Sequence, residues 1–197
     1  MNRLLAALAL IAFVTALVAI AIGSTRGGGD TSSTTTTTAP TQTQTHSTRP
    51  MTTVSTSKPR PVKLAPVGAF DPEGDQHEND SMAPLAVDGN PATLWKTEHY
   101  THGFFKKGVG LVLDAGARRS LTKVTVSTDS PGASAEIELG NIPNGPFHPV
   151  SAVRPLNGTT AFPLRAGASG RYVVVWITAL PSATGEAHVN EVRALGT

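Results

Sequence analysis

The sequence predicts an all-β sandwich or jelly-roll domain in the C-terminal two-thirds of the 197-residue chain. Apolar residues recur there with a period of two, which is typical of strands with one buried and one solvent-facing side. Turn-forming pairs that contain glycine, proline or asparagine separate these short segments. The stretch itself, residues 64–197, has a length that suits one sandwich domain.

Residues 4–22 form an apolar run without charge, in which Thr15 is the one polar side chain. As a helix this run would span roughly 29 Å, close to the ~30 Å hydrocarbon core of a bilayer. We therefore expect residues 1–23 to be a transmembrane signal anchor. Arg3 and the α-amino group favour a cytoplasmic N-terminus, which predicts a single-pass protein of the cell membrane with an extracytoplasmic C-terminal domain. Residues 19–21 also form a small-x-small cleavage site, so a cleaved signal peptide is the alternative.

Residues 24–63 are rich in threonine, serine and proline, including the run TSSTTTTT at 31–38. They contain few side chains that could bury apolar surface, so no packed core offsets the entropy of ordering them. This composition predicts a disordered stalk. As a coil, forty residues would have an end-to-end distance of roughly 35 Å.

Within residues 64–197 the expected strands fall into two kinds. Segments 123–126 and 135–139 alternate apolar and polar residues, whereas 111–113 and 173–177 are continuous apolar runs. A continuous run is typical of a central strand that is buried on both faces. The one helix expected in this stretch is short and lies around residues 81–87.

The charge of the chain is unevenly distributed. The whole chain has a net charge of +2, but residues 64–197 carry ten positive side chains against thirteen negative ones, a net charge of −3. The positive excess belongs to the stalk. Because the folded part has no basic excess, the sequence argues against nucleic-acid binding. The absence of cysteine excludes disulfides, thiolate zinc sites and cysteine nucleophiles.

The segment AVDGNPATLW at residues 86–95 resembles the A-x-D-G-D/N-x-x-T-x-W signature of discoidin-like (F5/8 type C, galactose-binding-like) domains. Residues 113–116 and 189–192 are similar to two further strand motifs of that family, in the same order. The flanking segments resemble discoidin-like domains of actinobacterial membrane proteins, such as the extracytoplasmic tails of lipid II flippase-like proteins and serine/threonine kinases. The resemblance covers about residues 66–195 and implies a discoidin-like jelly-roll β-sandwich.

The same resemblance implies a structural Ca²⁺ beside the turn at residues 88–91. The residues that match its ligands are Asp88, Asn90, Thr93 and Glu191, with backbone carbonyls completing the shell. Calcium takes six to eight hard oxygen ligands, which carboxylate, amide, hydroxyl and carbonyl groups provide. The alternative is a metal-free turn, held by hydrogen bonds from backbone N–H groups to Asp88. No other cofactor is expected.

A ligand-binding site is expected in the loop at residues 99–107, because binding residues often lie on loops carried by a rigid scaffold. The candidate side chains are Tyr100, His102, Phe104, Phe105 and Lys106. An aromatic face suits a sugar ring, and a lysine suits a phosphate or carboxylate. The alternative is that Phe104 and Phe105 close the end of the sandwich.

These observations predict a membrane-anchored extracytoplasmic binding module for a cell-envelope carbohydrate. The alternative is a protein-interaction or regulatory accessory of an envelope-synthesis or signalling protein, whose partner is an envelope protein. We expect no enzymatic activity, because the chain contains no G-x-S-x-G, H-E-x-x-H or P-loop motif.

Overall fold

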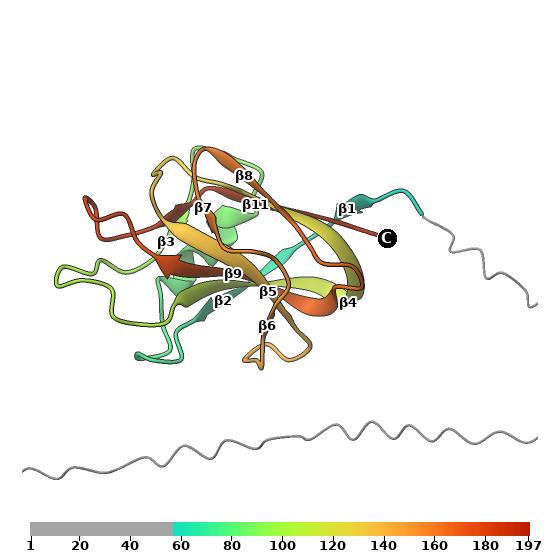
Figure 1. The fold of residues 1–197 in the computed structure, drawn as a ribbon, viewed down its shortest axis with the longest axis horizontal. Coiled ribbons are helices and arrows are strands. Elements are labelled where there is room, and N and C mark those ends of the chain that lie inside the picture. The colour runs from blue at the N-terminus through green and yellow to red at the C-terminus, as the bar shows by residue number, and fades with distance from the viewer. Residues whose placement is uncertain (1–56) are drawn as a thin grey trace, which may run out of the picture. The chain divides into compact units, whose positions relative to one another are not determined.

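The computed structural model describes residues 57–197 (Figure 1). The predicted membrane anchor and most of the predicted stalk lie outside these residues. Within the described residues, no helix has the length and apolar character needed to cross a membrane. The described chain folds into strands and one short 3₁₀ helix: β1 (Arg60–Val62), β2 (Ala65–Phe70), η1 (Asp80–Ala86), β3 (Trp95–Lys96), β4 (Val109–Ser127), β5 (Ser134–Gly140), β6 (His148–Pro149), β7 (Arg154–Pro155), β8 (Thr159–Pro163), β9 (Ser169–Ala179), β10 (His188–Val189) and β11 (Glu191–Gly196).

The strands form the two layers of a β-sandwich, and β4 belongs to both. Its first half pairs with β2 and β9, and β9 also pairs with β5. Its second half pairs with β8 and β11, and β11 also pairs with β1. All of these pairings are antiparallel. The two layers that they form confirm the predicted sandwich.

The long strand β4 unites two segments, 111–113 and 123–126, that the sequence presents as separate strands. The chain passes from one layer to the other near Gly116, whose φ of 77° is readily adopted by glycine. The strand therefore bends between the layers instead of ending in a loop.

The core lies between the layers, and its period-two pattern is the predicted one. In β5, Ala135, Ile137 and Leu139 are buried in the core, while Glu136 and Glu138 alternate with them. The predicted helix appears as η1, which contains Pro84. Proline lacks a backbone N–H donor, which is one reason why this helix stays short.

Strand β9 is buried on both faces, as its continuous apolar run predicts. Val173, Val175 and Ile177 belong to the core between the layers. Val174 and Trp176 belong to a second apolar cluster, against which the half-buried Phe70 and Phe147 pack.

The folded part starts earlier than the composition predicts. Strand β1 lies inside the range assigned to the stalk, where Pro59 and Pro61 are typical of a linker. Arg60 is nevertheless in register with Gly196. Proline is tolerated at a sheet edge because such a strand needs hydrogen bonds on one side only. The boundary therefore moves from residue 64 to about residue 60.

The sandwich has two distinct ends (Figure 1). One, which we call the loop end, carries the loops at residues 71–79, 87–94, 97–108, 128–133 and 180–187. The other, the entry end, holds residue 57, the bend of β4 and the C-terminal Thr197. Among the described residues, the core and the side chains packed on it draw on residues 62–194. A fragment that begins at Thr52 therefore contains the whole folded unit.

Candidate functional site

The short strand pair β3–β10 forms a platform at the loop end. Lys96 and His188 are register partners, so their side chains emerge next to one another. The Thr97 N–H donates to the Ala187 carbonyl, and the Ala187 N–H donates to Thr97 Oγ1, both at 3.0 Å. The Asn79 amide donates to the carbonyls of Lys96 and Thr97 at 3.1 and 3.0 Å. These bonds hold three separate loops in one arrangement.

A continuous chain of charged side chains lies on this platform. Lys96 Nζ donates to Glu186 Oε2 at 3.0 Å, and His188 Nε2 lies 3.2 Å from Glu186 Oε1. The other ring nitrogen of His188 lies 2.8 Å from Asp129 Oδ1. Burial would raise the pKa of Glu186, but hydrogen bonds from Lys96 and His188 outweigh it and lower that pKa below its usual value. Glu186 is therefore ionised at neutral pH and orients both donors.

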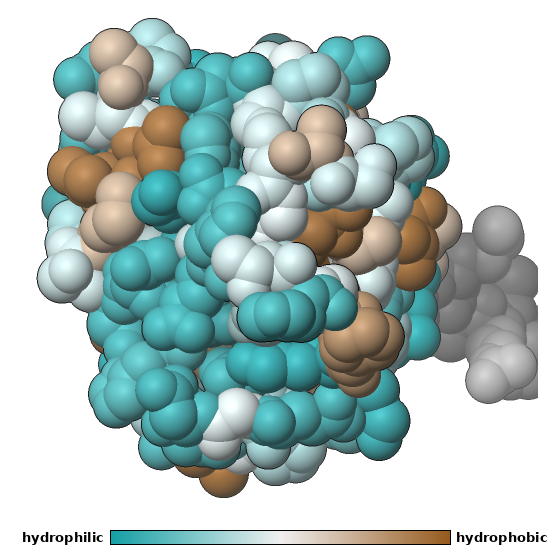
Figure 2. All heavy atoms as spheres, turned by 90° about the vertical axis from the view of Figure 1, so that its left-hand side faces the viewer, coloured by the Kyte–Doolittle hydropathy of each residue, from teal (hydrophilic) through white to brown (hydrophobic). Residues whose placement is uncertain are grey.

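Next to these charged side chains is a shallow hollow of about 370 Å³, lined by Asn79, Lys96, Thr97, Glu98, His99 and Glu186. The surface at this end is mainly hydrophilic, with separate hydrophobic patches (Figure 2). Ammonium, imidazole, carboxylate and amide groups together offer both donors and acceptors. Such an arrangement suits a ligand rich in hydroxyl groups, because each hydroxyl both donates and accepts.

None of these four charged residues is among the site residues predicted from the sequence. Lys96 lies one residue beyond the W of the A-x-D-G-N-x-x-T-x-W segment, whereas Asp129 and Glu186 lie in later loops and His188 begins β10. Strands β3 and β10 have only two residues each, which is too short for a hydrophobic period to reveal their pairing.

The predicted ligand-binding residues on the loop at 99–107 fall into two groups. Tyr100 and Lys106 turn towards two buried carboxylates, those of Asp71 and Glu78. Lys106 Nζ lies 2.7 Å from Asp71 Oδ2, 3.6 Å from Glu78 Oε1 and 2.9 Å from the Tyr100 hydroxyl, which itself donates to Glu78 Oε1. We call these four residues the buried ionic cluster. They link the loop to the segment before η1.

The aromatic residues of this loop differ in exposure. Phe104 is half-buried and packs edge to face on the ring of Tyr100, with 4.9 Å between ring centroids. Phe105 is 89% exposed, and His102 is also exposed. Phe105 and His102 are therefore the members of the predicted set that can contact a ligand without rearrangement.

The four predicted metal ligands lie together. Glu191, at the start of β11, accepts a 3.0 Å hydrogen bond from the Gly89 N–H, so its carboxylate reaches the turn at residues 88–91. Asp88 Oδ1 accepts from the Asn90 N–H at 2.8 Å, which is the hydrogen bond of the metal-free alternative. Among the described residues, no cluster of three or more His, Cys, Asp or Glu side chains is placed to hold a metal ion. A cation here would therefore need hydroxyl, amide and carbonyl oxygens as well.

Such oxygens surround Thr93. Its hydroxyl lies 2.8 Å from Asp88 Oδ2, 2.8 Å from the Asn90 carbonyl and 3.4 Å from the Leu85 carbonyl. A hydroxyl carries a single hydrogen, which serves one acceptor well at a time. This excess of oxygen acceptors over donors fits a hard cation.

Similar solved structures share the fold. No model of a known protein family matches the chain. A family 32 carbohydrate-binding module of Clostridium perfringens NanJ, in complex with galactose, matches with a TM-score of 0.51 and 17% identity over 70% of this chain and 99% of that one.

The family 32 module of AlyQ, in complex with 4,5-unsaturated mannuronic acid, matches with a TM-score of 0.50 and 17% identity over 66% and 95% of the two chains. A third such module, from a family 31 glycoside hydrolase of Clostridium perfringens, has a TM-score of 0.50 and 17% identity over 68% and 92%. The discoidin-like, galactose-binding-like fold is thereby confirmed.

Proposed function

We propose that this protein is a carbohydrate-binding module, anchored in the cell membrane by residues 4–22, which binds an extracytoplasmic cell-envelope glycan at the loop end. The observation that carries the proposal is the chain Lys96–Glu186–His188–Asp129 beside the hollow at the β3–β10 platform. The solved domains that share the fold include one bound to galactose and one bound to an unsaturated uronic acid, which supports a sugar as the ligand class.

The site is organised before a ligand arrives. The side chains of Glu186 and His188 are only 19% and 21% exposed, and each is held by two charged or polar partners. Holding these groups in place reduces the entropy lost when a ligand binds. The exposed ring of Phe105 on the neighbouring loop offers an apolar surface on which a sugar ring can stack.

The proposal is tested with the soluble fragment that begins at Thr52. We expect it to be retained by cell-envelope glycan and to give discrete signals on a glycan array. Lys96→Ala and His188→Ala should each weaken binding at least about tenfold, because each removes a donor from the platform. Lys123→Ala, which removes an exposed positive charge on β4, is the matched control and should bind like the parent chain.

The protein-interaction alternative and an enzymatic activity would each give a different experimental result. Crosslinking to an envelope protein in membranes, without retention on any glycan, would favour the protein-interaction accessory instead. Release of reducing ends from a bound glycan would contradict a non-enzymatic module. Variants at the platform that bind as the parent does would show that the ligand lies elsewhere.

Calcium binding at Asp88, Asn90, Thr93 and Glu191 belongs to the same proposal. Calcium at a concentration far above its dissociation constant should raise the melting temperature by about 5–10 °C, since ligand binding to the folded state alone adds stability. The measurement is differential scanning calorimetry with added calcium or with chelator. Asp88→Asn should abolish the shift, whereas the control Glu136→Gln should retain it. Equal melting temperatures with calcium and chelator would establish the metal-free turn.

A further inference from the structure

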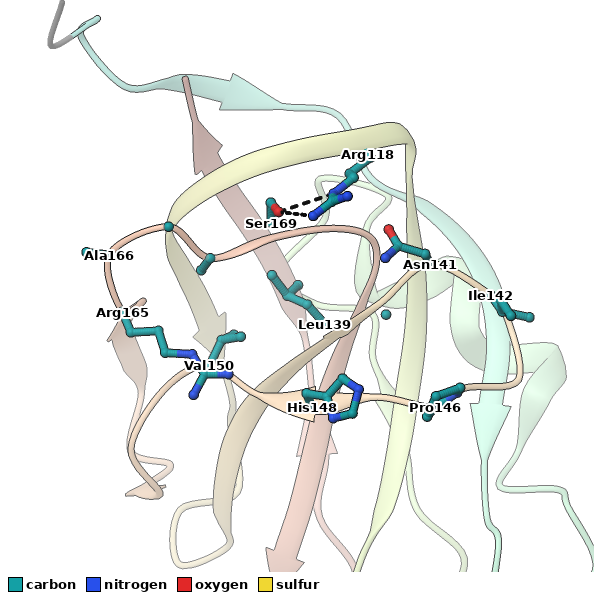
Figure 3. A pocket seen from close by; sticks show the side chains of 13 residues that line it. Arg118, Leu139, Asn141, Ile142, Pro146, His148, Val150, Arg165, Ala166 and Ser169 are labelled. Carbon is teal, nitrogen blue, oxygen red and sulfur yellow. Dashed lines mark hydrogen bonds between the residues drawn. The ribbon is translucent and has the colours of Figure 1, made fainter. Parts of the chain in front are cut away.

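A hollow of about 520 Å³ (Figure 3) opens at the entry end of the domain, beside the bend of β4. Residues from three parts of the chain line it: the stretch from the end of β5 to Val150 just after β6, residues 165–169 up to the start of β9, and Arg118 of β4. Its volume falls within the ~300–1,000 Å³ that is usual for small-molecule sites. None of the functional residues discussed above contributes to it.

The hollow has an apolar floor and a polar rim. Leu139, Val150 and Ala168 are buried residues of the core, and their side chains form the floor where the core ends. Arg165 and His148 lie on one side of the hollow, and Arg118 lies on the other (Figure 3). An amphipathic ligand, with an apolar face and charged or polar edges, fits this arrangement.

The rim carries positive charge without an acidic partner. None of the 13 lining residues is Asp or Glu. Arg118 donates through Nε and Nη2 to Ser169 Oγ at 3.2 and 2.9 Å, which fixes the guanidinium and leaves its other N–H groups available (Figure 3). Within residues 57–197, the side chains of Arg165 and His148 have neither a hydrogen-bond nor an ion-pair partner.

Several other positive side chains of the domain form ion pairs with carboxylates. Arg171, on β9, forms a two-bond ion pair with Asp114 at 2.9 and 2.8 Å. Lys96 and Lys106 are likewise paired with carboxylates. Two guanidinium groups without a carboxylate partner among the described residues therefore create a local excess of positive charge around one hollow, which an anionic ligand would neutralise.

We propose that this hollow binds a carboxylated saccharide, in which a uronic acid residue places its carboxylate against Arg165 or Arg118 and its ring against the Leu139–Val150 floor. Because the two guanidinium groups approach from different sides of the hollow (Figure 3), a saccharide with successive carboxylates can satisfy both. The Asn141 amide also lines the hollow and can meet sugar hydroxyls. The domain then carries two glycan sites at opposite ends and can link two glycans.

The experiment is a titration of the Thr52–Thr197 fragment, followed by calorimetry and by amide chemical shifts. The probes are oligogalacturonate, the fully methyl-esterified form of the same oligomer, and inorganic phosphate. We expect oligogalacturonate to shift amides of residues 140–148 and 165–169, and the ester to bind at least about tenfold more weakly because it lacks the charge. Phosphate should bind more weakly still.

Variants separate this site from the loop end. Arg165→Gln should weaken oligogalacturonate binding at least about tenfold, and it should fold normally because the guanidinium has no partner within residues 57–197. Arg118→Gln should act in the same direction. Arg154→Gln, which removes an exposed charge on β7, is the matched control. Amide shifts of residues 140–148 and 165–169 report on this hollow separately from the loop end, so a failure at the loop end does not affect this test.

The inference would be overturned by an unchanged affinity of Arg165→Gln and Arg118→Gln, by equal binding of the charged and esterified oligomers, or by amide shifts confined to the loop end. Phosphate binding as tight as that of oligogalacturonate would reduce the hollow to a simple anion site. Absence of any oligogalacturonate binding would overturn it as well.

Discussion

Replacing Lys106 with methionine is expected to lower the free energy of unfolding by about 3–5 kcal/mol at neutral pH. The Lys106 ammonium lies between Asp71 and Glu78, whose side chains are 1% and 0% exposed. Methionine keeps the length of the side chain but removes its charge. Two carboxylates would then remain buried without a cation, and breaking a buried ion pair in this way costs far more than losing a surface pair.

The loss should depend on pH in a defined direction. Burial raises the pKa of Glu78, although hydrogen bonds from Tyr100 and the Glu98 N–H and the charge of Lys106 act against it. Because the folded-state pKa is the higher one, the folded protein binds more protons than the unfolded chain between the two values, and its stability falls as pH rises through that window. Removing Lys106 raises the pKa of Glu78 further. The deficit of the variant should therefore be largest above that pKa and shrink towards about pH 4.

Urea denaturation of the Thr52–Thr197 fragment across this pH range measures the effect. Lys107→Met is the control, because Lys107 is 87% exposed and its partner Glu73 is also accessible to solvent. It should change the unfolding free energy by less than about 0.5 kcal/mol at any pH. A deficit for Lys106→Met that is the same at acid and neutral pH would contradict the assignment of the cost to buried ionised carboxylates.

Replacing Trp95 with alanine is expected to cost a further large amount, about 3–5 kcal/mol of unfolding free energy. Trp95 is 0% exposed and is the largest fully buried side chain among the described residues. Its indole N–H donates to the Glu78 carbonyl at 2.8 Å, and it is paired with Val189 across β3–β10. Alanine would leave a cavity under the platform and remove the donor from a buried carbonyl.

Trp95→Phe separates these two contributions. Phenylalanine fills most of the cavity but leaves the Glu78 carbonyl without its donor, so we expect a loss of about 1–3 kcal/mol. Far-UV circular dichroism is the suitable probe for urea unfolding, because Trp176 would dominate the fluorescence of both variants. A loss for Trp95→Ala below about 1 kcal/mol would mean that the core closes over the cavity.

Sequence patterns predicted the strands of this domain where a period or an apolar run is long enough. Strand β5 followed from its alternation and β9 from its continuous run, and both are confirmed. Strand β1 was missed because its prolines resemble the stalk. The continuity of β4 was missed because a bend at Gly116 looks like an ordinary turn in the sequence.

The candidate sites differ in how visible they are in the sequence. Asp88 and Glu191 were placed together by the family resemblance, and the structure does bring the Glu191 carboxylate to the Gly89 N–H. The charged chain at the platform could not be predicted in the same way. Its members come from three separate segments, which contain Lys96, Asp129 and the pair Glu186 and His188, and no spacing rule connects these segments.

The sequence by itself determined the β-sandwich class and the approximate extent of the folded segment. These properties follow from local rules, since alternation and turn residues act over a few positions. Only the tertiary structure decided which charges meet. It paired Lys106 with buried carboxylates, ordered Lys96, Glu186, His188 and Asp129 into one chain, and gathered Arg118 and Arg165 around one hollow. The physical reason is that electrostatic contacts depend on distance in space, which antiparallel pairing of remote segments sets and local sequence does not.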